Sequence, residues 1–451
     1  MEDWIANLEH NVAPKKIQRV LLSPEQLQRY MVEYYQVSRA VSNSQKSGSY
    51  DRDNKGVEAL LQLGDSQNPD ANDQHIVKLV DWVLQFAFEQ GASDIHLEPR
   101  KDNGKVRFRI DGVLHTIYNM PANTLTAVIS RIKILGRMNV AEKRKPQDGR
   151  LKTRTPKGQE TELRLSTLPT AFGEKLVMRI FDPEVLVRSF QQLGFEGHLL
   201  SDWQALTSHS HGIILVTGPT GSGKTTTLYS SLKQLATEQV NVCTIEDPIE
   251  MLEPSFNQMQ VNTGIDLGFA DGVRALMRQD PDIIMVGEIR DHDTANMAIQ
   301  AALTGHLVLS TLHTNDAPSS LTRLHDLGVQ PFLTAATILG VLAQRLVRRL
   351  CPHCKVEKQI NSQEWEHLTF DYIMEMPEKV FTAVGGDECR QTGYKGRVGI
   401  YEFMPVSLEA KQLIGANGDL TALRQQAKKE GIEPLRIAGA RKVLEGVTTL
   451  E

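Results

Sequence analysis

The sequence predicts an α/β protein of the P-loop class, preceded by a smaller α+β domain and followed by a small cysteine-containing module. Strands alternate with helices between residues 205 and 345. Such alternation produces a mostly parallel sheet covered by helices. A glycine-rich loop follows the first strand of this series, and two hairpin patterns precede it. The strands of the series are predicted at residues 213–216, 240–245, 283–286 and 307–310.

The composition is that of an ordinary soluble globular protein with room for about three domains. The chain has 451 residues, of which 40% are hydrophobic and 23% are charged, and its formal net charge is −5. This acidic balance weighs against a nucleic-acid partner. No charged segment followed by an apolar one opens the chain, and no apolar run reaches the ~20 residues of a membrane span. We therefore expect a cytoplasmic protein.

Residues 1–41 are predicted to form an N-terminal segment that either binds a partner or packs within a small subdomain. A helix is expected to begin at Ser23, where a capping residue is followed by proline. Its apolar residues recur at helical spacing and share one face. Serine, asparagine, glycine and aspartate dominate residues 42–73, which we interpret as a flexible linker with a short helix at 57–63.

The N-terminal α+β domain is predicted to span residues 74–185. Asp73 is placed to cap its first helix, which continues into an apolar face. Alternating apolar and charged residues on either side of Asp111-Gly112 predict one β-hairpin, and the segments around residues 156–158 predict a second. A helix packed on two hairpins accounts for an α+β domain of this length.

Residues 218–225 read G-P-T-G-S-G-K-T and match the pattern G-x-x-x-x-G-K-[ST], between a predicted strand and a predicted helix. Backbone N–H groups of such a loop surround phosphate oxygens. Lys224 would reach the β- and γ-phosphates, and the Thr225 hydroxyl would take one Mg²⁺ position. We therefore predict a site for ATP and Mg²⁺. The predicted nucleotide-binding residues of the loop are Gly218, Pro219, Thr220, Gly221, Ser222, Gly223, Lys224, Thr225 and Thr226.

Two acidic segments end neighbouring strands. Glu288 follows the apolar strand 283–286 and is the predicted activator of the attacking water, the alternative being a solvated acid. The segment 244–250 contains three acids after another strand. Parallel strands bring such residues to the same sheet edge, so Glu246 is predicted to hold Mg²⁺ together with Thr225, unless this segment is a plain turn with capping acids.

His306 and His313 lie at the two ends of the strand 307–310. We interpret both as candidates for sensing the γ-phosphate. The length of the strand separates them too far to ligate one metal ion. Arg164 and Arg179 fall in the N-terminal α+β domain, where the residue pattern alone describes them as solvated strand charges.

Six segments occur in one order and together resemble the secretion ATPases of type II secretion systems and type IV pilus assembly. The resemblance covers about residues 73–446. It implies a RecA-like ATPase core over residues 186–350, a PAS-like N-terminal domain and a ring-shaped homo-hexamer. The segments are A-S-D-I-H-L-E-P at 92–99, K-P-Q-D-G-R at 145–150, the phosphate loop, the Glu246 segment, V-G-E-I-R at 286–290 and L-S-T-L-H-T-N at 309–315.

The resemblance also assigns roles to residues. The phosphate loop, the Glu246 segment, the Glu288 segment and the His313 segment correspond to the Walker A, Asp box, Walker B and His box motifs. Arg164 and Arg179 match arginines that approach the phosphates from another domain, which would make them catalytic beside Glu288, Lys224 and His313. Further basic positions, matched at subunit or domain contacts, are Arg274, Arg278 and Arg323.

The cysteines depart from the family pattern. The resemblance to assembly-type members implies two C-x-x-C pairs that together hold zinc. This chain has the first pair, Cys351 and Cys354. Of the second pair it has only Cys389, and Gly386 stands where the other cysteine is expected. Three thiolates with one further ligand could hold Zn²⁺, and both outcomes stay open. The candidate fourth ligands are Asp387, Glu388, His353 and water.

The cysteine-containing module is predicted at residues 351–405, and a helical segment at 406–451 follows it. The last four residues have the form of a helix start, so we expect a truncated or unusually short tail. The resemblance implies a motor that hydrolyses ATP to drive pilus or pseudopilus assembly and protein export. Its expected partner is the cytoplasmic domain of an inner-membrane platform protein, through which it associates with that membrane. The alternatives are an ATP-binding scaffold with little turnover and a nucleic-acid translocase.

Overall fold

The computed structural model describes residues 70–156, 158, 160–180 and 188–450. The chain divides into two compact units, Met1–Ile180 and Phe181–Glu451, called here the N-terminal and the C-terminal unit. The predicted N-terminal segment 1–41 lies outside the described residues, as do residues 42–69 of the linker with the predicted helix at 57–63.

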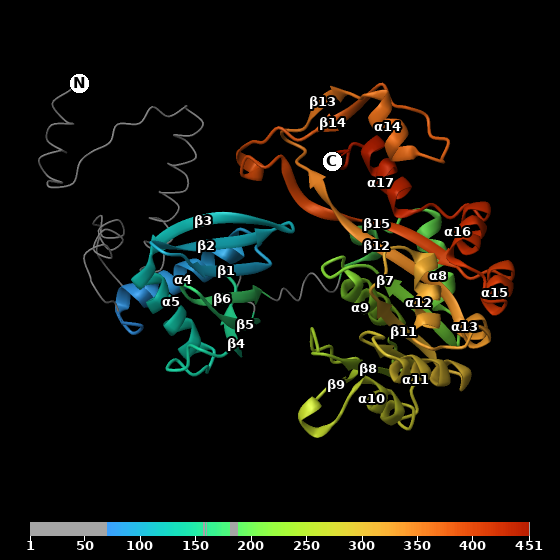
Figure 1. The fold of residues 1–451 in the computed structure, drawn as a ribbon, viewed down its shortest axis with the longest axis horizontal. Coiled ribbons are helices and arrows are strands. Elements are labelled where there is room, and N and C mark those ends of the chain that lie inside the picture. Colours follow the sequence, from blue (N-terminus) through green and yellow to red (C-terminus); the bar gives the residue numbers. More distant parts are fainter. Residues whose placement is uncertain (1–69, 157, 159, 181–187, 451) are drawn as a thin grey trace, which may run out of the picture. The chain divides into compact units, whose positions relative to one another are not determined.

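In its described residues, from 70 to 180, the N-terminal unit contains a six-stranded antiparallel sheet and two helices (Figure 1). Both predicted hairpins are confirmed, as β2–β3 and β4–β5, and they are joined through β1 and β6 in the order β3-β2-β1-β6-β5-β4. The elements are α4 (Gln74–Glu89), β1 (Asp94–Pro99), β2 (Asn103–Ile110), β3 (Val113–Pro121), α5 (Ala122–Leu135), β4 (Gln147–Arg154), β5 (Glu160–Thr170) and β6 (Gly173–Ile180).

The core of this unit follows from the two-residue period of its strands. Along β2 the apolar residues Val106, Phe108 and Ile110 are buried, whereas the arginines between them are partly exposed. The buried strand residues pack against the apolar faces of both helices, including Ile76 of α4 and Ile132 of α5. Charged side chains are thereby collected on the opposite face of the sheet.

The C-terminal unit is built on a seven-stranded sheet in the order β15-β12-β7-β11-β10-β8-β9. All neighbouring pairs are parallel except β12–β15. The four predicted strands are confirmed as β7, β8, β10 and β11. The strands are β7 (Gly212–Thr217), β8 (Val242–Glu246), β9 (Asn257–Gln260), β10 (Ile283–Val286), β11 (Leu307–Leu312), β12 (Ile338–Leu350) and β15 (Tyr394–Pro405).

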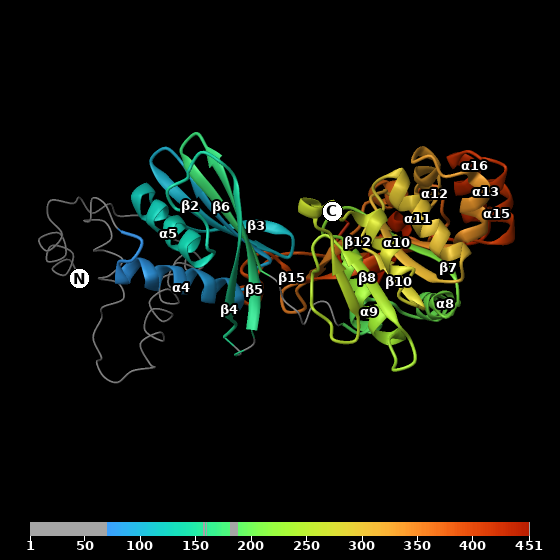
Figure 2. The ribbon, with the colours of Figure 1, turned by 90° about the horizontal axis from the view of Figure 1, so that it is seen from below.

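Helices cover both faces of this sheet, which explains the continuous apolar sequence of its central strands. In β7, Ile214 and Val216 pack with α8 and α9, whereas Ile213 and Leu215 belong to the core beneath α10 to α13. Figure 2 shows α8 and α9 on one side of the sheet and α11 to α13 on the other. The helices are α7 (Phe190–Leu193), α8 (His198–Thr207), α9 (Lys224–Leu235), η1 (Thr263–Ile265), α10 (Phe269–Leu276), α11 (His292–Leu303), α12 (Ala317–Asp326) and α13 (Pro331–Thr337).

The part of the chain after residue 350 packs against the core sheet more extensively than the sequence predicts. β15 occupies the last part of the predicted module 351–405, yet it pairs with β12 along nearly its whole length, so the core sheet extends beyond residue 350. Residues 406–450 contribute three helices, of which α17 packs with Trp365 and Val380 of the cysteine-containing segment. The remaining elements are β13 (Val356–Gln359), α14 (Ser362–Thr369), β14 (Lys379–Thr382), η2 (Asp387–Cys389), α15 (Leu408–Gly415), α16 (Leu420–Lys429) and α17 (Leu435–Leu444).

The helix expected to begin at residue 448 does not form in the described residues. The Thr448 hydroxyl instead donates to the backbone carbonyl of Arg348 at 2.8 Å, which ties this end to β12. Among the helices that the structure describes, none combines the length and the apolar character that crossing a membrane requires.

A buried ion pair joins α5 to β6 in the N-terminal unit. The Lys133 side chain is fully buried, and its ammonium group donates at 2.7 Å both to the carboxylate of Glu174 and to the carbonyl of Glu142. Removing one partner of such a pair leaves an uncompensated buried charge, whereas replacing both by apolar residues is often close to neutral.

We expect Lys133→Met to destabilise the N-terminal unit by about 3–5 kcal/mol, because Glu174 is left buried without its cation. The matched double variant Lys133→Met/Glu174→Leu should recover much of this loss. Urea unfolding, together with hydrogen exchange of α5 and β6, measures both effects in the full chain. A double variant less stable than the single one would contradict the proposed charge balance.

Candidate functional site

The phosphate loop lies at the carboxyl edge of the central sheet. It follows β7, and α9 begins at Lys224. Gly218, Gly221 and Gly223 all have positive φ values, at 149°, 80° and 90°. A Cβ atom at Gly218 would meet the carbonyl oxygen of Gln344 at 2.5 Å, so only glycine fits this position. The predicted strand, loop and helix are therefore present, and the remaining predicted loop residues, Thr225 and Thr226, lie in the first turn of α9.

The Lys224 side chain reaches back across the loop. Its ammonium group donates to the backbone carbonyl of Gly218 at 2.8 Å and to that of Pro219 at 3.2 Å. Burial lowers the pKa of Lys224 to about 8; the negative charge of Glu288 opposes this shift and the positive charge of Arg345 adds to it. The lysine is thus held within the loop by neutral oxygens, which entering phosphate oxygens would replace.

Gln344 holds the phosphate loop through side-chain hydrogen bonds, a role that the sequence patterns did not predict. It lies on β12 and is almost completely buried. Its side-chain amide donates to the carbonyl of Ser222 at 2.7 Å, and its side-chain oxygen accepts from the Thr227 hydroxyl at 2.9 Å. More than a hundred residues separate these partners in sequence, so only the pairing of β12 with β7 brings them together.

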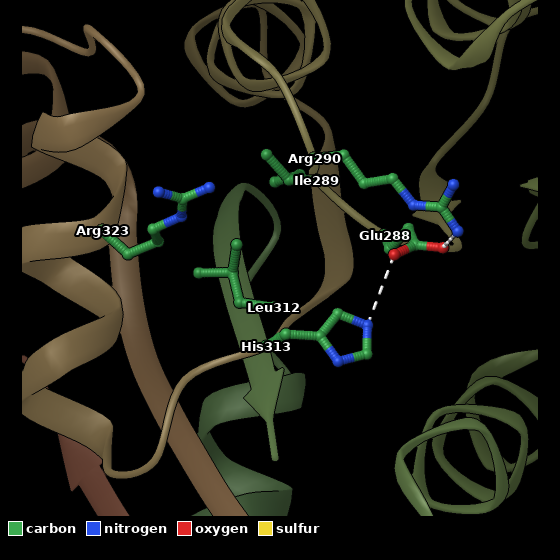
Figure 3. Close-up of a pocket in the computed structure, with 6 residues that line it drawn as sticks. All are labelled: Glu288, Ile289, Arg290, Leu312, His313 and Arg323. Carbon is green, nitrogen blue, oxygen red and sulfur yellow. Dashed lines mark hydrogen bonds and ion pairs between the residues drawn. The ribbon is translucent and has the colours of Figure 1, made fainter. Parts of the chain in front are cut away.

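Glu288, Arg290 and His313 form a charged group beside the loop (Figure 3). One carboxylate oxygen of Glu288 accepts from Arg290, and the other lies 3.3 Å from Nε2 of His313. Burial by itself would raise the pKa of Glu288, but the hydrogen bond and charge of Arg290, together with His313, hold the pKa below its usual range. Glu288 is therefore ionised at neutral pH.

These residues line an open pocket to which a third element contributes. Arg323 extends from α12 into the pocket, whereas Glu288 follows β10 and His313 follows β11 (Figure 3). Because β10 and β11 run parallel in register, their carboxyl ends place the acid and the histidine side by side. Two apolar side chains, Ile289 and Leu312, complete the lining.

Glu246 is at the carboxyl end of β8 as predicted, but its carboxylate is buried among protein donors. It accepts from the Tyr229 hydroxyl at 2.6 Å, the Thr244 hydroxyl at 2.7 Å and the Gln258 amide at 3.2 Å. Burial, followed by the charge of Glu246, raises the pKa of Tyr229. This network ties the loop helix α9 to β8 and β9. The role of Glu246 in holding Mg²⁺ stays a prediction.

The structure contradicts the prediction for His306. Leu307 pairs with Gly212 at the amino end of β7, whereas Leu312 pairs with Thr217 beside the phosphate loop. His306 therefore lies at the opposite sheet edge, about 20 Å of strand away. There its Nδ1 atom contacts the carbonyl of Ala301 at 2.8 Å. Only His313, of the two histidines, is placed at the candidate site.

The predicted arginines occupy three places, which are the sheet of the N-terminal unit, α10 with the turn after it and, for Arg323, α12. Arg164 and Arg179 are cross-strand neighbours on β5 and β6 of the N-terminal unit, and Arg179 also contacts Asp94 at 3.1 Å. Their approach to a nucleotide stays a prediction. On α10, Arg274 pairs with Asp271 at 2.7 Å, and Arg278 donates to the carbonyl of Arg274 at 2.9 Å.

A cluster of three cysteines lies at the end of β12. The sulfur atoms of Cys351, Cys354 and Cys389 all lie within 4.8 Å of one another. A Cβ atom at Gly386 would lie 3.4 Å from that of Cys354, which places the absent fourth cysteine of the family pattern beside the cluster. Three convergent thiols fit three corners of a tetrahedral zinc site.

Comparison with known proteins identifies the family. The family described as "Type II/IV secretion system protein" matches residues 69–451. The chain belongs to this family. It is 81% identical over 451 residues to the "Type IV pilus assembly ATPase TfpB" of Acinetobacter baylyi, covering all of this chain and 77% of that protein. It is also 39% identical over 467 residues to the "Type II secretion system ATPase E" of Vibrio cholerae serotype O1, covering all of this chain and 92% of that protein.

A solved structure of a pilus motor also resembles this chain in its fold. The crystal structure of "the Pilus Retraction Motor PilT and Bound ADP" matches with a TM-score of 0.55 and 27% sequence identity, covering 82% of this chain and 94% of that one. The predicted fold class is thereby confirmed as a RecA-like α/β sheet with a phosphate loop, preceded by an α+β unit and carrying a cysteine cluster near its end.

Proposed function

We propose that this member of the secretion family is a motor that hydrolyses ATP with Mg²⁺ to drive pilus or pseudopilus assembly and protein export at the inner membrane. The observation that carries the proposal is the ionised Glu288, held by His313 at the sheet edge that also bears the phosphate loop. A loop that binds phosphates beside an oriented carboxylate has the parts that phosphoryl transfer to water requires. The names of the relatives support the motor role.

In this mechanism the loop amides and Lys224 bind the phosphates, and Lys224 exchanges its two carbonyl partners for phosphate oxygens. The Thr225 hydroxyl and the Glu246 segment would hold the Mg²⁺ shell. Glu288 orients the attacking water through one carboxylate oxygen, and His313 holds that carboxylate in place. A low pKa suits a group that positions water and accepts its proton only late in the reaction.

Arg164 and Arg179 would complete the site by neutralising charge on the transferred phosphoryl group from another domain or subunit. The proposed assembly is a homo-hexamer, in which such contributions between subunits become possible. The proposed partner is the cytoplasmic domain of an inner-membrane platform protein, and the acidic balance of the chain weighs against nucleic acid. The proposed location is the cytoplasm, with peripheral association with the inner membrane.

One observation favours a scaffold that binds ATP with little turnover. Both carboxylate oxygens of Glu288 already have a partner, one in Arg290 and the other in His313, and these contacts compete with water for the carboxylate.

We expect Glu288→Gln to reduce ATP turnover by at least 100-fold while ATP binding is retained, because the amide cannot accept the proton of water. Turnover by a coupled phosphate assay and binding by calorimetry separate the two effects. Lys224→Ala should lose ATP binding as well as turnover, so it shows how a phosphate loop that cannot hold the nucleotide behaves in both assays. Unchanged turnover in Glu288→Gln would contradict the catalytic role of Glu288, whereas no turnover in the unaltered chain, even with its partners, would favour the scaffold.

Arg164→Ala and Arg179→Ala should spare ATP binding and slow turnover, since an arginine from outside the loop stabilises mainly the transition state. The matched control is Arg154→Ala, an exposed arginine at the end of β4 in the same sheet. Equal turnover in all three variants would contradict the proposed role of Arg164 and Arg179.

The lowered pKa of Lys224 predicts proton uptake on nucleotide binding. At pH 8 about half of the empty loops carry a neutral lysine, and bound phosphates raise its pKa, so roughly 0.5 proton should enter per nucleotide. The charges facing this lysine are Glu288 and Arg345, and neither titrates near pH 8. Affinity should therefore fall as the pH rises from 7 to 9.5.

Calorimetry in two buffers of different ionisation enthalpy measures this uptake. Lys224→Arg is the matched control, because a guanidinium group stays protonated and should abolish the uptake. The same uptake in both proteins would show that the proton enters elsewhere.

We further propose that Cys351, Cys354 and Cys389 hold Zn²⁺ through three thiolates, with water or a nearby side chain as the fourth ligand. Zinc at this position would tie the end of β12 to η2, and hence the cysteine-containing segment to the core sheet. The geometry that supports this is the convergence of the three sulfurs around one point.

Elemental analysis of the native protein should find about one zinc per chain. Cys389→Ser should release the metal and lower the stability of residues 351–405, whereas Cys243→Ser, at a buried cysteine in β8, should leave the metal content unchanged. Metal-free native protein of unaltered stability would contradict the zinc proposal.

A further inference from the structure

Arg345 is a cation beside the phosphate loop that no sequence motif singled out. It follows Gln344 on β12, the strand that pairs with β7 on the side away from β11. One of its terminal nitrogens, Nη1, lies 3.1 Å from the position of a Cβ atom at Gly218, the first residue of the loop. The positive charge of Arg345 is close enough to lower the pKa of Lys224.

Among the described residues, the guanidinium group of Arg345 forms hydrogen bonds with neutral oxygens only. Nη1 donates to the carbonyl of Gln344 at 3.3 Å, and Nη2 donates to the carbonyl and side-chain oxygens of Asn315 at 3.3 and 3.1 Å. Within the part of the chain that the structure describes, no carboxylate lies within ion-pair distance of it. Burial holds its pKa below the ordinary value, with the more distant Glu402 and Asp316 opposing the shift. A partly buried cation so placed is stabilised by an incoming anion.

A second unpaired group points to the same place. The Ser222 hydroxyl is 97% buried, since only 3% of the residue is exposed, and it has no hydrogen-bond partner among the described residues. It lies 2.6 Å from the Cβ position at Gly218 that Arg345 also approaches. An unpaired hydroxyl and an unpaired cation therefore meet at the first turn of the loop, where phosphate oxygens are their natural partners.

The geometry points to Arg345 as the residue that binds the γ-phosphate of ATP within the same subunit, and thereby distinguishes ATP from ADP. This inference rests on the proposed ATPase function. The choice of the γ-phosphate follows from Asn315, which fixes Arg345 and lies two residues beyond His313. His313 in turn holds Glu288, and the phosphoryl group that water attacks must lie between the loop and that acid. The planar fork of arginine donors suits three terminal phosphate oxygens.

Arg345→Gln tests the inference, because glutamine removes the charge and keeps a donor for Asn315. Binding of a non-hydrolysable ATP analogue and of ADP, each with Mg²⁺, is measured by calorimetry on the full chain. We expect the affinity for the ATP analogue to fall about tenfold or more, the effect of losing a charge-assisted hydrogen bond, with the affinity for ADP unchanged. The matched control Arg349→Gln, an exposed arginine four residues further along β12, should change neither affinity.

Retained ADP binding shows that the variant is folded around an intact loop. Equal losses for the two nucleotides, or no loss for either, would overturn the inference. Arg345→Lys is a second test that does not depend on the glutamine variant. Because lysine keeps the positive charge, this variant should retain part of the preference for the ATP analogue over ADP. Loss of the whole preference in Arg345→Lys would also count against the inference. If the unaltered chain binds neither nucleotide, the proposed function fails; if it prefers ATP and Arg345→Gln prefers it equally, only the role of Arg345 fails.

Discussion

The parallel register of β7, β11 and β10 is the constraint on which the candidate site depends. Because the three strands run in one direction, with Thr217 opposite Leu312 and Val286 opposite Ser310, the segments that follow them emerge at one sheet edge. The phosphate loop follows β7, His313 follows β11 and Glu288 follows β10. A shift of one residue in any of these pairings would turn every side chain of that strand to the other face.

Three charged groups at this edge are held by partners within the protein. Lys224 is bound by loop carbonyls, Glu288 by Arg290 and His313, and Glu246 by Tyr229. When a nucleotide enters the loop, several of these groups must therefore exchange a protein partner for a nucleotide oxygen. The free energy lost with each protein contact is offset by the contact formed with the nucleotide. Such an exchange couples phosphate chemistry to the positions of α9, β10 and β11, which is what a motor requires of its active site.

β12 connects this site to the end of the chain. Its middle carries Gln344 and Arg345, which support the phosphate loop, and its end leads directly to Cys351 of the cysteine cluster. β15 pairs with it along almost its whole length, and Thr448 bonds to it from the last described residues. The sequence separates these parts, but the sheet makes them one element.

The sequence by itself determined the features that depend on local pattern. The glycine loop with its flanking strand and helix, the four buried strands of the core and both hairpins follow from residue spacing, because backbone geometry and burial act over a few neighbouring residues. The placement of Glu246 and Glu288 at one sheet edge was also predicted, since strand ends in a parallel sheet share an edge.

Only the tertiary structure decided which distant residues meet. Strand direction put His306 at the far edge, although its pattern matched that of His313. The addition of β15 to the core sheet brought part of the predicted module into the ATPase unit. Gln344, Arg345 and Tyr229 joined the site through hydrogen bonds to residues that lie from 17 to more than a hundred positions away. Such contacts depend on how whole elements pack, and no local spacing records them.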